Sequence, residues 1–150
     1  MSAPLADFLY ERGAAWLERL QPDVIVPVPS HTIKLKKRGF NPPLLLSRHL
    51  SKKSKIPVFH KALVSVKEVP SQAGLKRKDR LKNVRGAFLA DKRQINERAV
   101  LLLDDVFTTG ATADECARTL KKAGARQVAV MTLARAVDWD IQPRDQSMDP

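Results

Sequence analysis

Apolar positions follow two different periods along this chain, one typical of helices and one typical of buried strands. Leu5, Leu9 and Trp16 belong to an apolar series at helical spacing, and Pro4 suits a first turn, which predicts an amphipathic helix over residues 4–20. Similar patterns predict helices over residues 43–53 and 111–123. Short apolar runs predict strands over residues 24–28, 58–66, 86–90, 99–103 and 127–133.

The stretches between these elements complete a domain plan. Residues 70–85 are polar and show no periodicity, which predicts a loop, and Gly124 is well placed to cap the preceding helix. Strands that alternate with helices favour parallel pairing through right-handed crossovers. We therefore expect a three-layer α/β domain with a parallel sheet over residues 1–135, followed by an irregular acidic tail over residues 136–150.

Length and composition restrict the class of protein. The chain has 150 residues and 43% hydrophobic residues, which suits one globular domain with a sizeable core. Its apolar runs fall far short of the roughly 18 residues of a membrane helix, and Asp7, Glu11 and Arg12 interrupt the N-terminal pattern. We expect neither membrane insertion nor a signal peptide. A single cysteine, Cys116, excludes an internal disulfide and favours a cytoplasmic protein.

The net charge of +11 is unevenly distributed. Residues 136–150 carry a net charge of −3, so residues 1–135 carry +14. This excess of cations favours an anionic partner, although a basic solubility surface explains any single lysine equally well.

The most informative segment is the predicted strand at residues 99–103 with the residues that follow it. Asp104 and Asp105 come directly after the apolar run, and a turn of small residues then leads into a helix. Ligands bind parallel sheets at the carboxyl ends of the strands, and a helix N-terminus attracts phosphate. Acids beside an anion site suit hydroxyl groups or hydrated Mg²⁺, so the pattern favours a sugar phosphate; neither a Walker loop nor a Rossmann glycine spacing is present. An ordinary buried strand with an acidic end is the alternative.

This segment resembles the phosphoribosyl-pyrophosphate (PRPP) signature of type I phosphoribosyltransferases. Three further blocks resemble the ComF (competence protein F) branch of that family: Pro-Val-Pro-Ser at 27–30 with Arg-Gly-Phe-Asn at 38–41, Gln-Ala-Gly-Leu at 72–75, and Arg-Leu-Lys-Asn-Val at 80–84 with Ala-Phe at 87–88. The resemblance runs from about residue 5 to Arg135. It implies a type I phosphoribosyltransferase fold and a transferase or glycosyltransferase that uses PRPP with magnesium.

The resemblance also implies roles for individual residues. Asp104 and Asp105 would bind the ribose hydroxyls, and Asp104 would reach Mg²⁺ through water. The 5-phosphate would bind to Thr108, Thr109, Gly110, Ala111 and Thr112. The turn after the first strand would bind pyrophosphate through Ser30 and His31, helped by Lys37 and Arg38. His31 as an acid or base is the less favoured interpretation, because a histidine in a basic loop is more often a simple donor.

The basic stretch at residues 70–85 has two interpretations. A charge run is often only a solvated face. The functional interpretation is a mobile lid in which Arg77 and Arg80 neutralise departing pyrophosphate, since guanidinium groups bind phosphate oxygens in pairs. The remaining cations are candidates for contacts with single-stranded DNA: Lys34, Lys36, Lys76, Lys78, Lys82 and Arg85.

Two departures from the ComF pattern affect these expectations. The family usually opens with a four-cysteine zinc module, whereas this chain holds one cysteine, so we expect no zinc here; the module is either lost or on a separate chain. Pro42 and Val69 replace a usual Gln and Thr. The favoured function is a ComF-like role in DNA uptake or processing during competence, with competence proteins as possible partners. The alternatives are a nucleotide-salvage phosphoribosyltransferase and a non-catalytic module that binds single-stranded DNA or a partner protein.

Overall fold

The computed structural model describes residues 2–69, 76–107 and 110–135. Its centre is a parallel sheet in the order β1-β4-β5, in which β1 spans Val24–Pro27, β4 spans Ala99–Phe107 and β5 spans Gln127–Arg135. The other helices and strands are α1 (Ser2–Leu20), α2 (Thr32–Arg38), α3 (Pro42–Ser54), β2 (Leu63–Ser65), α4 (Arg77–Val84), β3 (Phe88–Ala90), α5 (Lys92–Ile95) and α6 (Ala111–Lys122).

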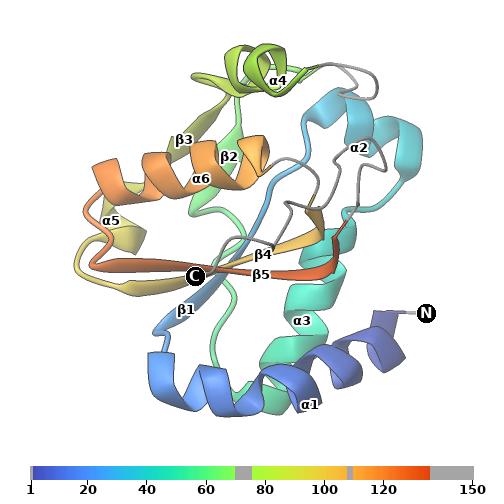
Figure 1. Cartoon of the computed structure of the whole chain (residues 1–150), viewed down its shortest axis with the longest axis vertical. Coiled ribbons are helices and arrows are strands. Elements are labelled where there is room, and N and C mark those ends of the chain that lie inside the picture. Colours follow the sequence, from blue (N-terminus) through green and yellow to red (C-terminus); the bar gives the residue numbers. More distant parts are fainter. Residues whose placement is uncertain (1, 70–75, 108–109, 136–150) are drawn as a thin grey trace, which may run out of the picture.

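Alternation along the strands produces the three layers. Leu101 and Leu103 of β4 pack with Ile25 and with apolar residues of α1 and α3. Val100 and Leu102 point to the other face, where they pack with Cys116 and Leu120 of α6 and with buried residues around β2 and β3. Figure 1 shows α1 and α3 below the sheet and α6 above it. The expected three-layer α/β fold with a parallel sheet is confirmed.

Most predicted elements appear close to their expected bounds. Helix α6 ends at Lys122, shortly before the glycine that was predicted to cap it. Gly124 has a φ of +98° directly after the helix, a left-handed conformation that favours glycine. The predicted strand over residues 58–66 needs correction, however. Val58 forms only an isolated parallel bridge with Ile25, and residues 63–65 form β2, which pairs antiparallel with β3 in a separate sheet.

Three further segments differ from the sequence prediction. Residues 77–84 form helix α4 and are not a loop, and residues 32–38 form helix α2, for which the sequence predicted no element. The short helix α5 was not predicted. Strand β4 continues past residue 103 to Phe107, so Asp104 and Asp105 lie within it. The expected irregular tail at 136–150 lies outside the described residues, as do residues 70–75.

Above α6, β2 and β3 form a small upper lobe with α4 (Figure 1). Helix α4 packs against α6, and β3 packs against the same helix. Helix α6 therefore lies between the main sheet and α4. No described helix combines the length and apolarity that a membrane span requires.

Candidate functional site

The carboxyl edge of the main sheet brings the sequence-predicted site segments together. Strand β1 ends beside β4, where Val28 N donates a hydrogen bond of 2.9 Å to Leu103 O. The turn from Pro29 to His31 therefore starts next to Asp104. Segments separated by more than 70 residues in the sequence thus meet at one edge.

Asp104 and Asp105 form a coupled carboxyl pair at this edge. Asp105 N donates to Asp104 Oδ1 at 2.8 Å, and a hydrogen bond also joins the two side chains. Asp104 is only 9% exposed, whereas Asp105 is half-buried. Adjacent residues of a strand usually point to opposite faces, so this contact shows that both carboxyl groups turn toward the same place.

Burial raises the pKa of Asp104 to about 7, and the side-chain hydrogen bond and negative charge of Asp105 add to the rise, whereas the hydrogen bond from Asp105 N opposes it. Asp104 therefore holds its proton far more strongly than an exposed aspartate. A ligand that supplies hydroxyl donors or a cation would favour the ionised pair. The pair is thus suited to polyhydroxylated or cationic ligands.

The start of α6 supplies the anion-attracting half of the site. Gly110 precedes the helix in a left-handed conformation with φ of +81°, which favours glycine. Ala111 is buried and Thr112 half-buried in the first turn, where helix N–H groups and the helix dipole favour an anion. Thr108 and Thr109 lie outside the described residues, so their predicted phosphate contacts stay predictions.

The turn after β1 is held by Asn41, the last residue of the Arg-Gly-Phe-Asn motif. Asn41 Nδ2 donates to Val28 O and its Oδ1 accepts from Ser30 Oγ, both at 3.4 Å. His31 O accepts from Leu35 N at 3.0 Å at the start of α2. Lys37 and Arg38 lie in the last turn of α2 and are exposed, and the side chain of Lys34 lies outside the described ones.

The basic residues of α4 and of its two flanking positions lie on the upper lobe. Lys76, Lys78, Lys82 and Arg85 are exposed, and the side chain of Arg77 is not among those described. Arg80 is half-buried, and its Nε atom is buried with no hydrogen-bond partner among the described residues. A buried guanidinium N–H without an acceptor is unsatisfied, which favours a partner such as an anion for this side chain.

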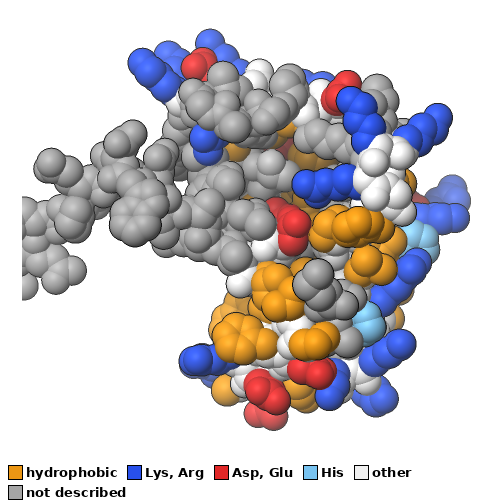
Figure 2. Space-filling model, turned by 90° about the vertical axis from the view of Figure 1, so that its right-hand side faces the viewer, with side chains coloured by type: hydrophobic (Ala, Val, Ile, Leu, Met, Phe, Trp, Pro, Cys, Tyr) orange, Lys and Arg blue, Asp and Glu red, His pale blue; other side chains and the backbone are white. Residues whose placement is uncertain are grey.

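Figure 2 looks onto the side of the molecule at which the strands end, and Lys and Arg side chains gather along its top, where α4 lies, and along one flank. Lys36, Lys37 and Arg38 of α2 add an exposed cluster. Coulomb attraction to an anionic ligand would act from both clusters. The surface is therefore basic around a small acidic centre.

The structure also shows a polar network that the sequence did not reveal. Glu115 is 7% exposed on α6, and its carboxylate accepts hydrogen bonds from Arg118 and from Gly86 N. These bonds and the positive charges of Arg118 and Arg85 keep the pKa of Glu115 below its ordinary value. The spacing of Glu115 and Arg118 on a helix signals an ion pair, but nothing local indicates the contact with Gly86.

The other two histidines and the cysteine do not extend the site. His49 is half-buried on α3, His60 is exposed, and Cys116 is buried in the core, where burial raises the pKa of its thiol. In the part of the chain that the structure describes, no group of three or more His, Cys, Asp or Glu residues could hold a metal ion. A metal at this edge would need ligands from a substrate or from water.

Comparison with known proteins finds relatives that include a competence protein and a DNA utilization protein. Competence protein F of Haemophilus influenzae is 39% identical over 132 residues, which are 86% of this chain and 58% of that protein. DNA utilization protein YhgH of Escherichia coli K12 is 32% identical over 133 residues, 89% of this chain and 57% of that protein. The chain thus spans less than two thirds of the length of these relatives. No protein-family model matches the chain.

Solved structures with the same fold come from a different functional context. Glutamine PRPP amidotransferase from B. subtilis superimposes with a TM-score of 0.60 at 18% identity, covering 88% of this chain and 26% of that chain. An APRTase from Giardia lamblia gives a TM-score of 0.58 at 17% identity, covering 89% of this chain and 80% of that chain. At this level of identity, the likeness establishes the fold alone. The chemistry has to be argued from the residues of the candidate site.

Proposed function

Because this chain is a homologue of Competence protein F with a type I phosphoribosyltransferase fold, we propose that it binds PRPP with Mg²⁺ and acts in DNA uptake or utilization. The names of the two relatives support the DNA-related role. The observation that carries the ligand proposal is the coupled carboxyl pair of Asp104 and Asp105 beside the N-terminus of α6.

PRPP matches the chemistry of this edge group by group. Its ribose hydroxyls would donate to Asp104 and Asp105, and its 5-phosphate would bind at Gly110, Ala111 and Thr112 with Thr108 and Thr109. Its pyrophosphate would lie toward Ser30 and His31, with Lys37, Arg38 and Arg80 as cationic partners. The carboxylate oxygens suit Mg²⁺, which usually retains several waters and takes its other ligands from phosphates, so Asp104 would reach it through water.

Titration calorimetry of PRPP with Mg²⁺ tests this proposal. Asp105→Asn should lower PRPP affinity about ten- to a hundredfold, because a hydrogen bond to a charged group contributes about 1.5–3 kcal/mol. Asp91→Asn is the matched control: it makes the same substitution at the start of α5, near the opposite end of β4, and Asn can still accept the hydrogen bond of 2.9 Å from Arg93 N. Absence of binding by the folded wild-type protein would rule out the ligand.

The catalytic form of the proposal is phosphoribosyl transfer. A nitrogen nucleophile of an acceptor would attack the anomeric carbon, and the bond to pyrophosphate would break with its electron pair leaving on pyrophosphate. Arg77 and Arg80 would stabilise that developing charge. Arg80→Ala should then reduce pyrophosphate release more than PRPP affinity, whereas equal losses would indicate uniform binding. A nucleobase acceptor would favour the nucleotide-salvage alternative.

Binding of single-stranded DNA is the second candidate function, and the exposed cations of α4 and α2 favour it. Phe40, 51% exposed, is the aromatic residue beside the α2 cluster, so phosphate contacts should dominate over base stacking. The DNA contacts would come from Lys34, Lys36, Lys76, Lys78, Lys82 and Arg85. Fluorescence anisotropy with an oligonucleotide at increasing salt would measure it, and competition by PRPP would show whether both ligands use the same cations.

A further inference from the structure

Helix α4 cannot hold its position by apolar packing alone. It spans eight residues, Arg77–Val84, and Val84 is its one side chain described as buried. Isolated helices of this length are unstable in water. The place of α4 on the molecule therefore depends on contacts at its ends.

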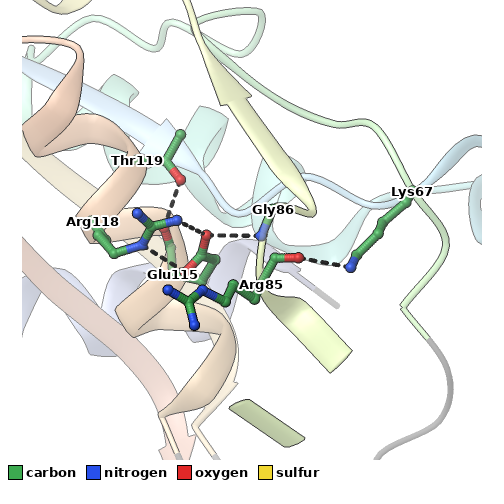
Figure 3. Close-up of polar contacts among 6 residues, drawn as sticks. All are labelled: Lys67, Arg85, Gly86, Glu115, Arg118 and Thr119. Atoms are coloured by element: carbon green, nitrogen blue, oxygen red, sulfur yellow. Dashed lines mark hydrogen bonds and ion pairs between the residues drawn. The ribbon is translucent and has the colours of Figure 1, made fainter. Parts of the chain in front are cut away.

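The C-terminal end of α4 is fixed by Glu115 of α6. Gly86 N, two residues after the helix, donates a hydrogen bond of 3.1 Å to Glu115 Oε1 (Figure 3). Arg118 Nε donates to Glu115 Oε2 at 2.9 Å, so the carboxylate is bound on both oxygens. The contact links segments 29 residues apart in the sequence.

A second contact fixes the same turn from the other side. Arg85 O accepts a hydrogen bond of 2.7 Å from Lys67 Nζ, as Figure 3 also shows. Gly86 has a φ of +70°, and a Cβ atom there would meet nothing within 4 Å. The left-handed backbone, and not a lack of space, favours glycine at this turn.

Glu115 is close to the proposed anion site along its own helix. It lies four residues after Ala111, which is about 6 Å along the helix axis at 1.5 Å per residue. Arg118 neutralises the carboxylate, so Glu115 can serve as an acceptor this near an anion without repelling it. The residue that anchors α4 is thus part of the helix whose N-terminus faces the ligand.

We infer that Glu115 is a positioning residue: by holding Gly86, it fixes α4 relative to the N-terminus of α6, so that Arg80 faces the pyrophosphate group of the bound ligand. This inference rests on the proposed binding of PRPP. Arg80 is half-buried with an unsatisfied Nε donor, and its guanidinium group would pair with such a group. Glu115 itself does not touch the ligand in this arrangement.

A comparison of two ligands separates positioning from general stability. Ribose 5-phosphate needs the acid pair and the α6 N-terminus, whereas PRPP with Mg²⁺ adds the pyrophosphate that α4 would contact. Glu115→Ala should lower PRPP affinity about tenfold and change ribose 5-phosphate affinity less than about twofold, because one hydrogen bond and its geometry are lost. Retained binding of ribose 5-phosphate also shows that the variant is folded.

Two further variants complete the experiment. Glu115→Gln keeps an acceptor for Gly86 and should retain PRPP affinity within about threefold, a rescue by the conservative substitution. Thr119→Val is the matched control on the same helix, because it removes the hydrogen bond from Thr119 Oγ1 to Glu115 O without affecting Gly86. It should leave the affinities for both ligands unchanged.

The outcomes distinguish the two proposals. If the wild-type protein binds neither ligand, the proposed function falls and this inference falls with it. If the wild-type protein binds both ligands but Glu115→Ala loses affinity for both equally, or for neither, only the positioning role is overturned. Selective loss of PRPP affinity in Glu115→Ala, with recovery in Glu115→Gln, supports it.

Discussion

The layers on the two sides of the main sheet are held in different ways. Below the sheet, α1 and α3 pack through buried apolar side chains such as Leu9, Leu17, Leu46 and Leu50. Above it, α6 packs on the sheet in the same way, but α4 beyond it is attached through Glu115, Gly86 and Lys67. Apolar packing is non-directional and insensitive to pH, whereas the attachment of α4 also depends on directional polar bonds.

The difference suggests two roles: the apolar layers control folding, and the part attached by polar bonds controls binding. Deep apolar packing contributes most of the free energy of unfolding, so the lower layer and the sheet should control whether the protein folds. Polar anchors contribute less but specify geometry, so the upper lobe should control what the folded protein binds. The acid pair at the edge of β4 should affect both stability and binding, because it is buried and yet polar.

The largest expected effect tests the apolar side. Leu101→Ala removes a fully buried side chain from the central strand, and it should lower the free energy of unfolding by about 3–4 kcal/mol through lost burial and a residual cavity. Leu5→Ala, at a position 41% exposed on α1, is the control and should cost below about 1 kcal/mol. Urea denaturation measures both. Similar losses in the two variants would contradict the assignment of the core.

The acid pair should give the next largest effect, with a sign that depends on pH. The folded-state pKa of Asp104 is about 7, against 3.8 for an ordinary aspartate, so folded protein retains this proton where unfolded protein has lost it. Stability should therefore fall as pH rises from about 4 through 7. Asp104→Asn removes this penalty and should raise the free energy of unfolding at pH 8 by about 1–3 kcal/mol.

Denaturation of wild-type protein and Asp104→Asn across pH 5–8 measures this effect without ligand. The advantage of the variant should shrink as pH falls, because the wild-type carboxyl regains its proton. A constant difference across this range would show that Asp104 does not titrate there. The same variant should lose PRPP affinity, so that stability and binding change in opposite directions.

The polar anchor should contribute less to stability. Glu115→Ala breaks the hydrogen bond to Gly86 and should lower the free energy of unfolding by about 1 kcal/mol. Arg118→Ala, which leaves the Gly86 contact in place, should cost less, since Arg118 is 44% exposed and its ion pair is partly screened by water. Thermal melting of both variants measures the order, and a larger loss in Arg118→Ala would reverse the assigned roles.

The smallest effect on stability should accompany a clear effect on DNA binding. Lys78 and Lys82 are exposed on α4, so replacing both with alanine should change the free energy of unfolding by less than about 0.5 kcal/mol. If both contact phosphates, the slope of log affinity against log salt should become shallower by about 1.4. Lys52 and Lys53 on α3 provide the matched double variant, and an equal change in slope from that pair would rule out a specific DNA surface on α4.

The elements of the scaffold could be predicted from the sequence alone. Unbroken apolar runs and helical spacing predicted β1, β4, β5, α1, α3 and α6, because burial on two faces of a parallel sheet imposes a hydrophobic pattern that is visible locally. The position of the candidate site was predicted from the acids after residue 103 and from the small residues around Gly110, because they follow a buried strand. Strand topology then required those residues to lie at one edge.

The secondary structure and strand pairing of the upper lobe could not be predicted from the sequence. The cations of α4 carry no apolar period, so a loop was the natural prediction, yet packing of Val84 and the contact of Gly86 with Glu115 stabilise a helix there. Residues 58–66 show a strand pattern, but a pattern cannot tell that Val58 joins β1 and Leu63–Ser65 joins β3. The raised pKa of Asp104 likewise depends on burial, which arises from neighbours distant in the sequence.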